Sequence, residues 1–346
     1  MLLQALVGDE EIAAFFSDAA DLKAMLAFEV ALAAAEAEAG LIPAEAAAAI
    51  EEGCRRFEPD WPGLAAGMAK DGVVGPAFVA ALRRAVGEPH GRWVHHGATS
   101  QDVVDSSLVL RLKSVVAVLD GRIAFLIAAL EDLQGTQGTV PLMAHTRMQR
   151  ALPFTAADKV ATWLRPLRRH RERLSEIGPR VLVLQLGGAV GTLDAMAGKG
   201  EMVAASAAGR LGLGSVPSWH TARDGIVELA SWLALVAGSL GKIGQDVALM
   251  GQNEVGSVRI AGGGGSSAMP HKSNPVAAEI LVSLARFAAG LSATLASSLV
   301  HENERSGAAW TLEWMVLPQL AVATGAALRH ARALCRGLEF VASPRP

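Results

Sequence analysis

The chain has 346 residues, of which 51% are hydrophobic and 19% charged, with a net charge of −3 and a mean hydropathy of +0.32. The small charge and the absence of a basic stripe argue against a nucleic-acid partner. Two cysteines provide no disulfide framework and no signal peptide is recognisable, so we expect a cytoplasmic protein. The longest apolar stretches, 276–300 and 226–241, carry charges or are short, so no membrane span is expected. Helices that are apolar on all sides are usually buried against other helices or other subunits. We therefore expect a large helical oligomer.

The first part of the chain predicts an N-terminal helical domain, 1–100. Apolar side chains recur at helical spacing across 18–39, and Gly40 ends that helix. A second helix begins near Pro43. Prolines and glycines then interrupt 58–100, which predicts short helices and loops.

The rest of the chain, 101–346, predicts a bundle of long helices. Residues 101–134 contain no proline and carry apolar residues at helical spacing, which predicts a helix of roughly 50 Å. Further long helices are expected over 153–177, 222–254, 275–300 and 310–338. A bundle is the simplest way to bury such apolar faces. The predicted fold class is therefore all-α, an elongated bundle with a small N-terminal domain.

One segment between two apolar stretches, 262–275, reads GGGGSSAMPHKSNP. Four consecutive glycines are costly inside a helix or strand, so they predict a hinge. Two serines lie at the tip, and Lys272 and Asn274 beyond them are able to bind an anion. The alternative is a surface linker, which would not need Met269, Pro270 and Lys272 at those offsets. We therefore interpret the segment as a catalytic flap.

A second candidate site lies in the segment WVHHGATSQDVVD, residues 93–105. Thr99 and Ser100 directly precede a long predicted helix, as capping residues do. Amides and hydroxyls at a helix N-terminus also bind anions. Capping explains one of the hydroxyls but not His95 and Gln101 beside them. The segment therefore predicts a site for a substrate carboxylate.

The flap resembles the signature loop of the fumarase/aspartase superfamily, G-S-S-x-M-P-x-K-x-N-P. In that family the first serine, here Ser266, transfers a proton beside a carboxylate, and the lysine and asparagine, here Lys272 and Asn274, hold the carboxylate. Lys272 would also help to activate the serine, because a serine hydroxyl is a poor base on its own. Ser267 and Met269 are expected to contact the substrate. The resemblance implies that no metal and no organic cofactor are needed.

Other segments strengthen the resemblance. The segment at 93–105 is similar to the H-x-G-A-T-S-Q-D motif of two branches, the adenylosuccinate lyases and the 3-carboxy-cis,cis-muconate cycloisomerases. The match implies substrate contacts from His95, Thr99, Ser100 and Gln101.

Three more segments carry single candidates. Glu254 matches an acidic position that orients a histidine of another subunit, although an acidic residue near a helix end is usually solvated. The segment 301–318 resembles the cycloisomerase branch and offers Arg305 to a second carboxylate. The segment 217–224 resembles it as well, and there Arg223 is a further carboxylate candidate.

The segment LMAHTRMQRALP, residues 142–153, is similar to the superfamily motif R-T-H-x-Q-x-A-x-P with one departure. Gln149 matches, but Arg147 occupies the position of a histidine that assists the leaving group in lyases. Drift in a surface loop is one explanation. The chemical alternative is that a carboxylate, with a pKa of about 4, needs no proton donor at neutral pH. An arginine that fixes a carboxylate is then more useful than an acid, so we predict that Arg147 and Gln149 bind substrate.

Together these motifs look closest to the 3-carboxy-cis,cis-muconate cycloisomerase branch, which forms 4-carboxymuconolactone in protocatechuate breakdown, part of the beta-ketoadipate pathway. The implied mechanism is addition of one substrate carboxylate to an alkene carbon, with the charge stabilised by cations and hydroxyls, and proton delivery by Ser266. An adenylosuccinate lyase and a catalytically inactive homologue are the alternatives. The resemblance also implies a homotetramer with active sites shared between subunits, no membrane association, and a chain that lacks the family's C-terminal helical domain.

Overall fold

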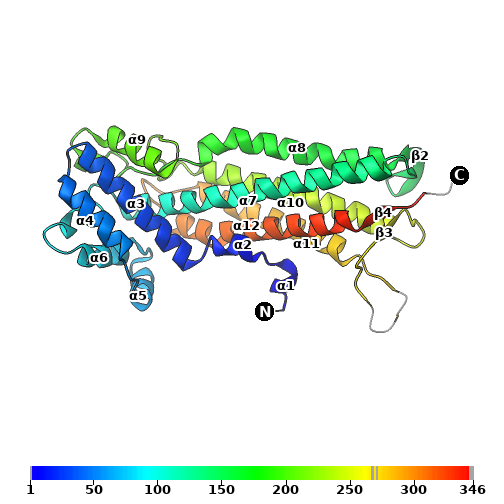
Figure 1. The fold of residues 1–346 in the computed structure, drawn as a ribbon, viewed down its shortest axis with the longest axis horizontal. Helices are drawn as coiled ribbons and strands as arrows, with labels where there is room; N and C mark the ends of the chain where they lie inside the picture. The colour runs from blue at the N-terminus through cyan, green and yellow to red at the C-terminus, as the bar shows by residue number, and fades with distance from the viewer. Residues whose placement is uncertain (1, 266–268, 270–271, 343–346) are drawn as a thin grey trace.

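The computed structural model describes residues 2–265, 269 and 272–342 as an elongated bundle of helices (Figure 1). The predicted all-α bundle is confirmed, with short strands only at one end. The long helices of the body are α7 (Ser100–Gln137), α8 (Ala156–Val181), α10 (Asp224–Met250), α11 (Val276–Ala296) and α12 (Gly307–Arg336). Each of these helices corresponds to a long helix predicted from the sequence, because apolar spacing and helix-breaking residues mark where a helix lies.

Capping side chains set the beginnings of these helices. Asp102 Oδ2 accepts the backbone N–H of Thr99 at 2.9 Å at the start of α7. Asp158 accepts the N–H of Thr155 at 2.9 Å at the start of α8 in the same way. Side chains of this kind satisfy backbone groups that a helix end leaves unpaired.

Shorter helices gather at the N-terminal end of α7. These are α3 (Asp18–Glu38), α4 (Ala44–Arg55), α5 (Trp61–Asp71), α6 (Gly75–Val86) and α9 (Gly200–Leu211). Their buried apolar residues, Phe28 and Phe78 among them, form a cluster separate from the core of the bundle, in which Trp163 and Trp232 lie. Two small helices, α1 (Gln4–Val7) and α2 (Glu10–Ala14), lie beside the bundle. Three 3-10 turns complete the helical elements: η1 (Gly91–Trp93), η2 (Asp194–Met196) and η3 (Ser297–Leu299).

Two small antiparallel sheets lie at the other end. β1 (Pro141–Thr146) pairs with β2 (Gln149–Thr155), and β3 (Val258–Ile260) pairs with β4 (Leu338–Phe340). The first pair is a hairpin that the sequence did not predict, so the helix expected from residue 153 begins at Ala156 instead. The reason is local: Arg147 and Met148 take the turn with φ of 48° and 68°, without the glycine that usually marks such a turn.

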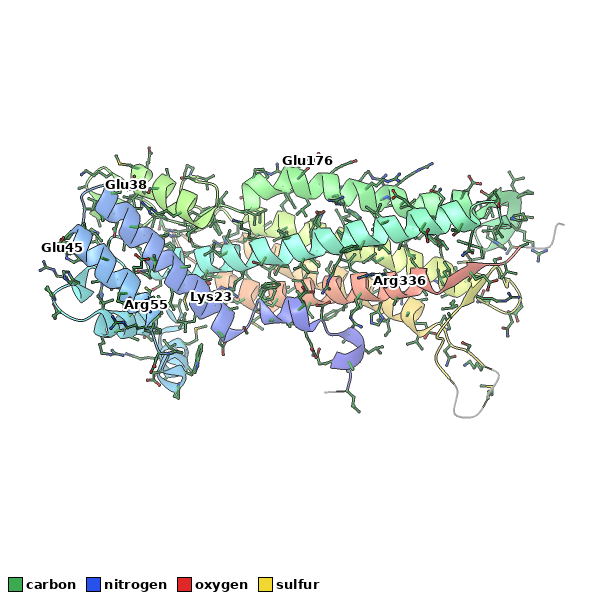
Figure 2. The ribbon with its side chains drawn as sticks, in the orientation of Figure 1. Lys23, Glu38, Glu45, Arg55, Glu176 and Arg336 are labelled. Carbon is green, nitrogen blue, oxygen red and sulfur yellow. The ribbon has the colours of Figure 1, made fainter. Side chains whose placement is uncertain are left out.

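Charged side chains such as Glu45, Arg55, Glu176 and Arg336 cover the outer faces (Figure 2). By length and composition alone, two helices are apolar enough to cross a membrane. In Asp224–Met250 the most apolar stretch is 56% buried, which fits a core helix, whereas in Val276–Leu299 it is only 22% buried. α11 therefore presents an apolar face that this chain alone does not cover.

Candidate active site

The predicted site residues divide between the two ends of α7. This helix has 38 residues, which at 1.5 Å per residue is roughly 57 Å. His95, Thr99, Ser100, Gln101 and Arg305 lie at its N-terminal end. Arg147, Gln149, Glu254, Lys272 and Asn274 belong to segments at or near the opposite end, where α7, α10 and the flap meet the short strands (Figure 1). One chain therefore does not bring the predicted residues into one site.

At the N-terminal end the residues are joined by hydrogen bonds. Gln101 is buried, and its Oε1 accepts Arg305 Nε at 2.9 Å. Its Nε2 donates to the carbonyl of His220 at 2.8 Å and to Asp105 at 3.1 Å. Arg305 also donates to the Ala189 carbonyl at 3.1 Å. Gln101 therefore holds Arg305 in place, and its own polar atoms are already bonded to the protein.

A cavity of about 580 Å³ lies beside this network, between α6 and the start of α7. Its polar lining comes from Arg83, His95, Thr99 and Ser100. Gly75 at the start of α6 packs so closely that an added Cβ would lie 2.5 Å from Ser100 Oγ. A glycine is therefore required for α6 to form the cavity wall. His95, Thr99 and Ser100 thus line a cavity at the N-terminus of α7, whereas Gln101 does not.

His95 enters this cavity from a constrained backbone with φ of 62°. Its Nδ1 lies 2.6 Å from Glu29 Oε1, and its backbone N–H donates to Glu29 Oε2 at 3.0 Å. Burial lowers the pKa of His95, but the charge and hydrogen bond of Glu29 outweigh it, so the pKa is raised above its usual value. The next histidine, His96, makes a similar contact with Glu36 at 2.9 Å.

Asp105, which accepts a hydrogen bond from Gln101, belongs to a buried ion cluster with Arg223 and Glu313. Arg223 was predicted to bind a substrate carboxylate, but it is fully buried and binds two carboxylates of the protein. Its Nη1 donates to Asp105 at 2.6 Å and its Nη2 to Glu313 at 2.5 Å. Burial alone would lower the pKa of Arg223, but the charges and hydrogen bonds of Asp105 and Glu313 have the larger effect. The pKa is therefore raised, and Arg223 stays charged. Trp310 Nε1 adds a hydrogen bond to Asp105 at 2.9 Å.

Asp102 links the same region to the loop before α9. It accepts the N–H groups of Gly187 and Gly188, each at 2.9 Å, and contacts His220 Nε2 at 2.9 Å. Asp102 is the last residue of the motif H-x-G-A-T-S-Q-D, but the sequence assigned it no role. Its position fixes the turn that carries Thr99.

At the opposite end the predicted residues that the structure describes are exposed, except Asn274, which is half-buried. Arg147 and Gln149 lie at the tip of the β1–β2 hairpin, and Glu254 lies in a turn after α10. The flap is anchored where Gly264 and Asn274 exchange backbone hydrogen bonds of 2.8 Å. Lys272 is exposed beyond this anchor. Ser266 and Ser267, the predicted proton-transfer residue and its neighbour, lie outside the described residues, whereas Met269 is described and is 43% exposed.

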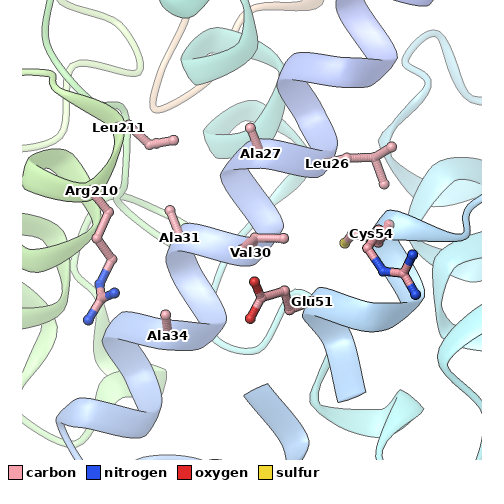
Figure 3. Close-up of a pocket in the computed structure, with 10 residues that line it drawn as sticks. Leu26, Ala27, Val30, Ala31, Ala34, Glu51, Cys54, Arg210 and Leu211 are labelled. Atoms are coloured by element: carbon pink, nitrogen blue, oxygen red, sulfur yellow. The ribbon is translucent and has the colours of Figure 1, made fainter. Parts of the chain in front are cut away.

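A second hollow, of about 470 Å³, is lined by α3, α4 and the end of α9 (Figure 3). Its lining is mainly apolar, with Glu51, Cys54, Arg55 and Arg210 as polar members. Burial, with smaller effects from Glu29 and Glu51, raises the pKa of the Cys54 thiol to about 12. Because the thiol stays protonated at neutral pH, Cys54 is not a nucleophile. Within the described ranges, no three His, Cys, Asp or Glu side chains cluster as metal ligands.

Comparison with known proteins decides the family. A sequence model of the family described as Lyase matches residues 7–290. The 3-carboxy-cis,cis-muconate cycloisomerase of Pseudomonas aeruginosa is 47% identical, over 94% of this chain and 72% of its own length. The chain belongs to this lyase family, among its 3-carboxy-cis,cis-muconate cycloisomerases. Solved structures agree with this membership.

The 3-carboxy-cis,cis-muconate lactonizing enzyme from Pseudomonas putida matches with a TM-score of 0.91 and 41% identity, over 98% of this chain and 77% of its own. The beta-carboxy-cis,cis-muconate cycloisomerase from Acinetobacter calcoaceticus matches with a TM-score of 0.92 and 33% identity, over 99% and 78%. The cycloisomerase fold therefore extends over nearly the whole of this chain.

Proposed function

We propose that this enzyme is a cycloisomerase that converts 3-carboxy-cis,cis-muconate to 4-carboxymuconolactone. The observation that carries the proposal is 47% identity to a cycloisomerase over 94% of the chain, with the cavity of His95, Thr99 and Ser100 in place. The pathway is then protocatechuate breakdown in the cytoplasm. The adenylosuccinate lyase and inactive-homologue alternatives are less well supported, because the first relatives in sequence and structure are cycloisomerases.

The reaction needs cations for a tricarboxylate and a proton for one carbon. His95 and Arg305 supply positive charge at one end of α7, and Arg147 and Lys272 supply it at the other. A substrate carboxylate forms the new C–O bond as the alkene π bond breaks, and charge moves into a neighbouring carboxylate. Ser266 then gives its proton to the carbanion carbon and takes another from solvent water, so the reaction consumes one proton overall. Arginine and lysine charges suit this reaction because no leaving group has to be protonated.

We propose that the active sites are shared between subunits of a homotetramer. Support comes from the length of α7, which separates the two halves of the predicted site by roughly 57 Å. Further support comes from α11, whose most apolar stretch is only 22% buried and whose Phe287 is 49% exposed. An apolar helix face of this kind is a typical oligomer contact. A second copy would bring its flap to the His95 end of the first.

The activity is tested by mixing purified protein with 3-carboxy-cis,cis-muconate and following ultraviolet absorbance. We expect loss of the conjugated diene, with the lactone as product. Adenylosuccinate serves as the second substrate in the same assay. Turnover of adenylosuccinate alone would support the lyase alternative, and no turnover of either would support an inactive homologue.

The shared site is tested by light scattering and by complementation. Ser266→Ala and Thr99→Ala chains should each be inactive alone. After mixing and subunit exchange, part of the activity should return, because some sites then combine an intact flap with an intact Thr99. A monomer that still turns over substrate would contradict the shared site.

A further inference from the structure

Glu29 is a buried carboxylate that makes two contacts with a single histidine. It lies on α3, its side chain is 1% exposed, and it accepts both the backbone N–H and Nδ1 of His95. The Nδ1–Oε1 distance of 2.6 Å means that Nδ1 carries a hydrogen in this contact. The ring tautomer and the ring direction are therefore both set by Glu29.

The other ring nitrogen is left for a ligand. His95 Nε2 is buried, has no hydrogen-bond partner within the described part of the chain, and belongs to a side chain that is 9% exposed. His95 also lines the cavity of Thr99 and Ser100. A buried polar atom without a partner is uncommon in proteins, and beside a cavity it indicates a group that binds there.

We propose that Glu29 is a positioning residue for the cycloisomerase reaction, which holds His95 so that Nε2–H points to a substrate carboxylate in the α6–α7 cavity. The proposal rests on the proposed function for the identity of the ligand. Glu29 itself does not touch the substrate, because His95 lies between Glu29 and the cavity. It acts by keeping the imidazole in one orientation and by favouring its protonated form.

The charged groups around His95 come from three helices. Glu29 on α3 and Asp102 on α7 favour the imidazolium, whereas Arg83 on α6 opposes it and burial opposes it most strongly. The balance raises the pKa of His95. A substrate carboxylate would thus meet an N–H donor on a ring whose charged form Glu29 and Asp102 favour. As pH rises through the pKa of His95, this donor is lost and substrate binding weakens.

The test compares Glu29→Gln with the matched variant Glu36→Gln. Glu36 lies on the same helix, is equally buried and contacts the neighbouring His96, which does not line the cavity. Three measurements are made on each protein: the ring ¹⁵N shifts of His95 against pH, the pH profile of KM and kcat, and thermal melting. Glu29→Asp, which keeps the charge, is included to look for partial recovery.

In Glu29→Gln we expect the pKa of His95 to fall by about one unit or more, as the loss of a carboxylate in contact predicts. KM should rise about tenfold at roughly pH 7.5, with a smaller change in kcat, and Glu29→Asp should recover part of this. Glu36→Gln should keep the wild-type profile. If the Glu29→Gln profile matches Glu36→Gln, the proposal is wrong.

The wild-type titration separates this proposal from the proposed function. It needs no substrate and no variant, so it applies even if Glu29→Gln does not fold. A wild-type His95 that titrates at or below its ordinary pKa of about 6.5, or that carries its single hydrogen on Nε2, would overturn the positioning role. Absence of cycloisomerase activity in the wild type would instead contradict the proposed function.

Discussion

The two ends of α7 carry the two halves of the predicted site, and they are built differently. At the N-terminal end Gln101, Asp105 and Arg223 are fully buried and joined by hydrogen bonds. At the opposite end Arg147 and Lys272 lie exposed on a hairpin and a flap. The first half is fixed by the fold of a single chain. The second half is not enclosed by the same chain, and this is what the proposed site shared between subunits would explain.

This difference predicts which substitutions affect activity and which affect stability. A change to the buried ion cluster of Asp105, Arg223 and Glu313 should lower stability and activity together, because its charges hold one another. A change in the exposed half should affect activity alone.

The largest effect is expected for the flap. Ser266→Ala should lower kcat about 10²- to 10⁴-fold, the usual contribution of proton transfer by a positioned side chain. The melting temperature and the proposed tetramer should not change, because Gly264 and Asn274 anchor the described part of the flap by backbone hydrogen bonds that the substitution leaves in place. Ser267→Ala is the matched control and should be milder. Near wild-type turnover in Ser266→Ala would rule out the assignment.

The next effect tests the buried half. Arg223→Met removes the only cation seen to bond both Asp105 and Glu313 among the described residues, and leaves two carboxylates buried together. We expect the free energy of unfolding to fall by about 3–5 kcal/mol, as when one partner of a buried ion pair is removed. The measurement is urea unfolding followed by circular dichroism. Lys272→Met, at an exposed position, should change stability little. An equal loss of stability in both variants would contradict the difference between the buried and the exposed half.

The sequence predicted the helices better than the places where segments meet. The periodic apolar residues of 101–134 lie within α7, at Ser100–Gln137. The β1–β2 hairpin was missed because its turn uses Arg147 and Met148 rather than glycine, and because β2 is largely exposed. A pattern of buried residues cannot mark a strand that is not buried.

Sequence patterns also predicted the residues of the site better than the contacts between them. The residue types at 93–105 predicted an anion site, and the structure places Thr99 and Ser100 at a cavity. The contact between Gln101 and Arg305 joins positions 204 residues apart, which spacing along the chain cannot show. Arg223 was mistaken for a substrate ligand because its burial depends on Asp105 and Glu313, from two other helices.

A pH effect on stability is expected from Glu36 in the buried half. Burial, and then the charge of Glu29, raise the pKa of Glu36 from 4.5 to about 9, so the folded protein keeps a proton that the unfolded chain releases. Stability from this group is therefore greatest at low pH and is lost as pH rises toward 9. Glutamine imitates the protonated acid, because its amide N–H can donate to His96 Nδ1.

Glu36→Gln should then gain stability over the wild type as pH rises, by at most about 3 kcal/mol between roughly pH 6 and pH 8. Urea unfolding at several pH values measures this difference. Glu38→Gln is the control, since Glu38 is exposed on the same helix. A difference that stays constant with pH would show that Glu36 is ionised in the folded protein.

The smallest effect is expected at the exposed half, where Arg147 is predicted to bind a substrate carboxylate. Arg147→His should raise KM about tenfold at pH near 8, where histidine is neutral, and less at pH near 6, where it is charged. Arg147→Lys should also lose affinity, because a lysine cannot make the two-pronged contact. Histidine tolerates the positive φ of 48° at this position, so the backbone of the turn should be kept.

The measurement is the pH profile of kcat and KM for wild type, Arg147→His and Arg147→Lys. Arg150→His on the same hairpin is the matched control, because it changes the same charge on a neighbouring exposed residue. Melting temperatures should be equal in all four proteins, since exposed hairpin side chains add little to stability. If Arg147→His keeps the wild-type KM near pH 8, Arg147 does not bind substrate, and its departure from the family motif is drift in a surface loop.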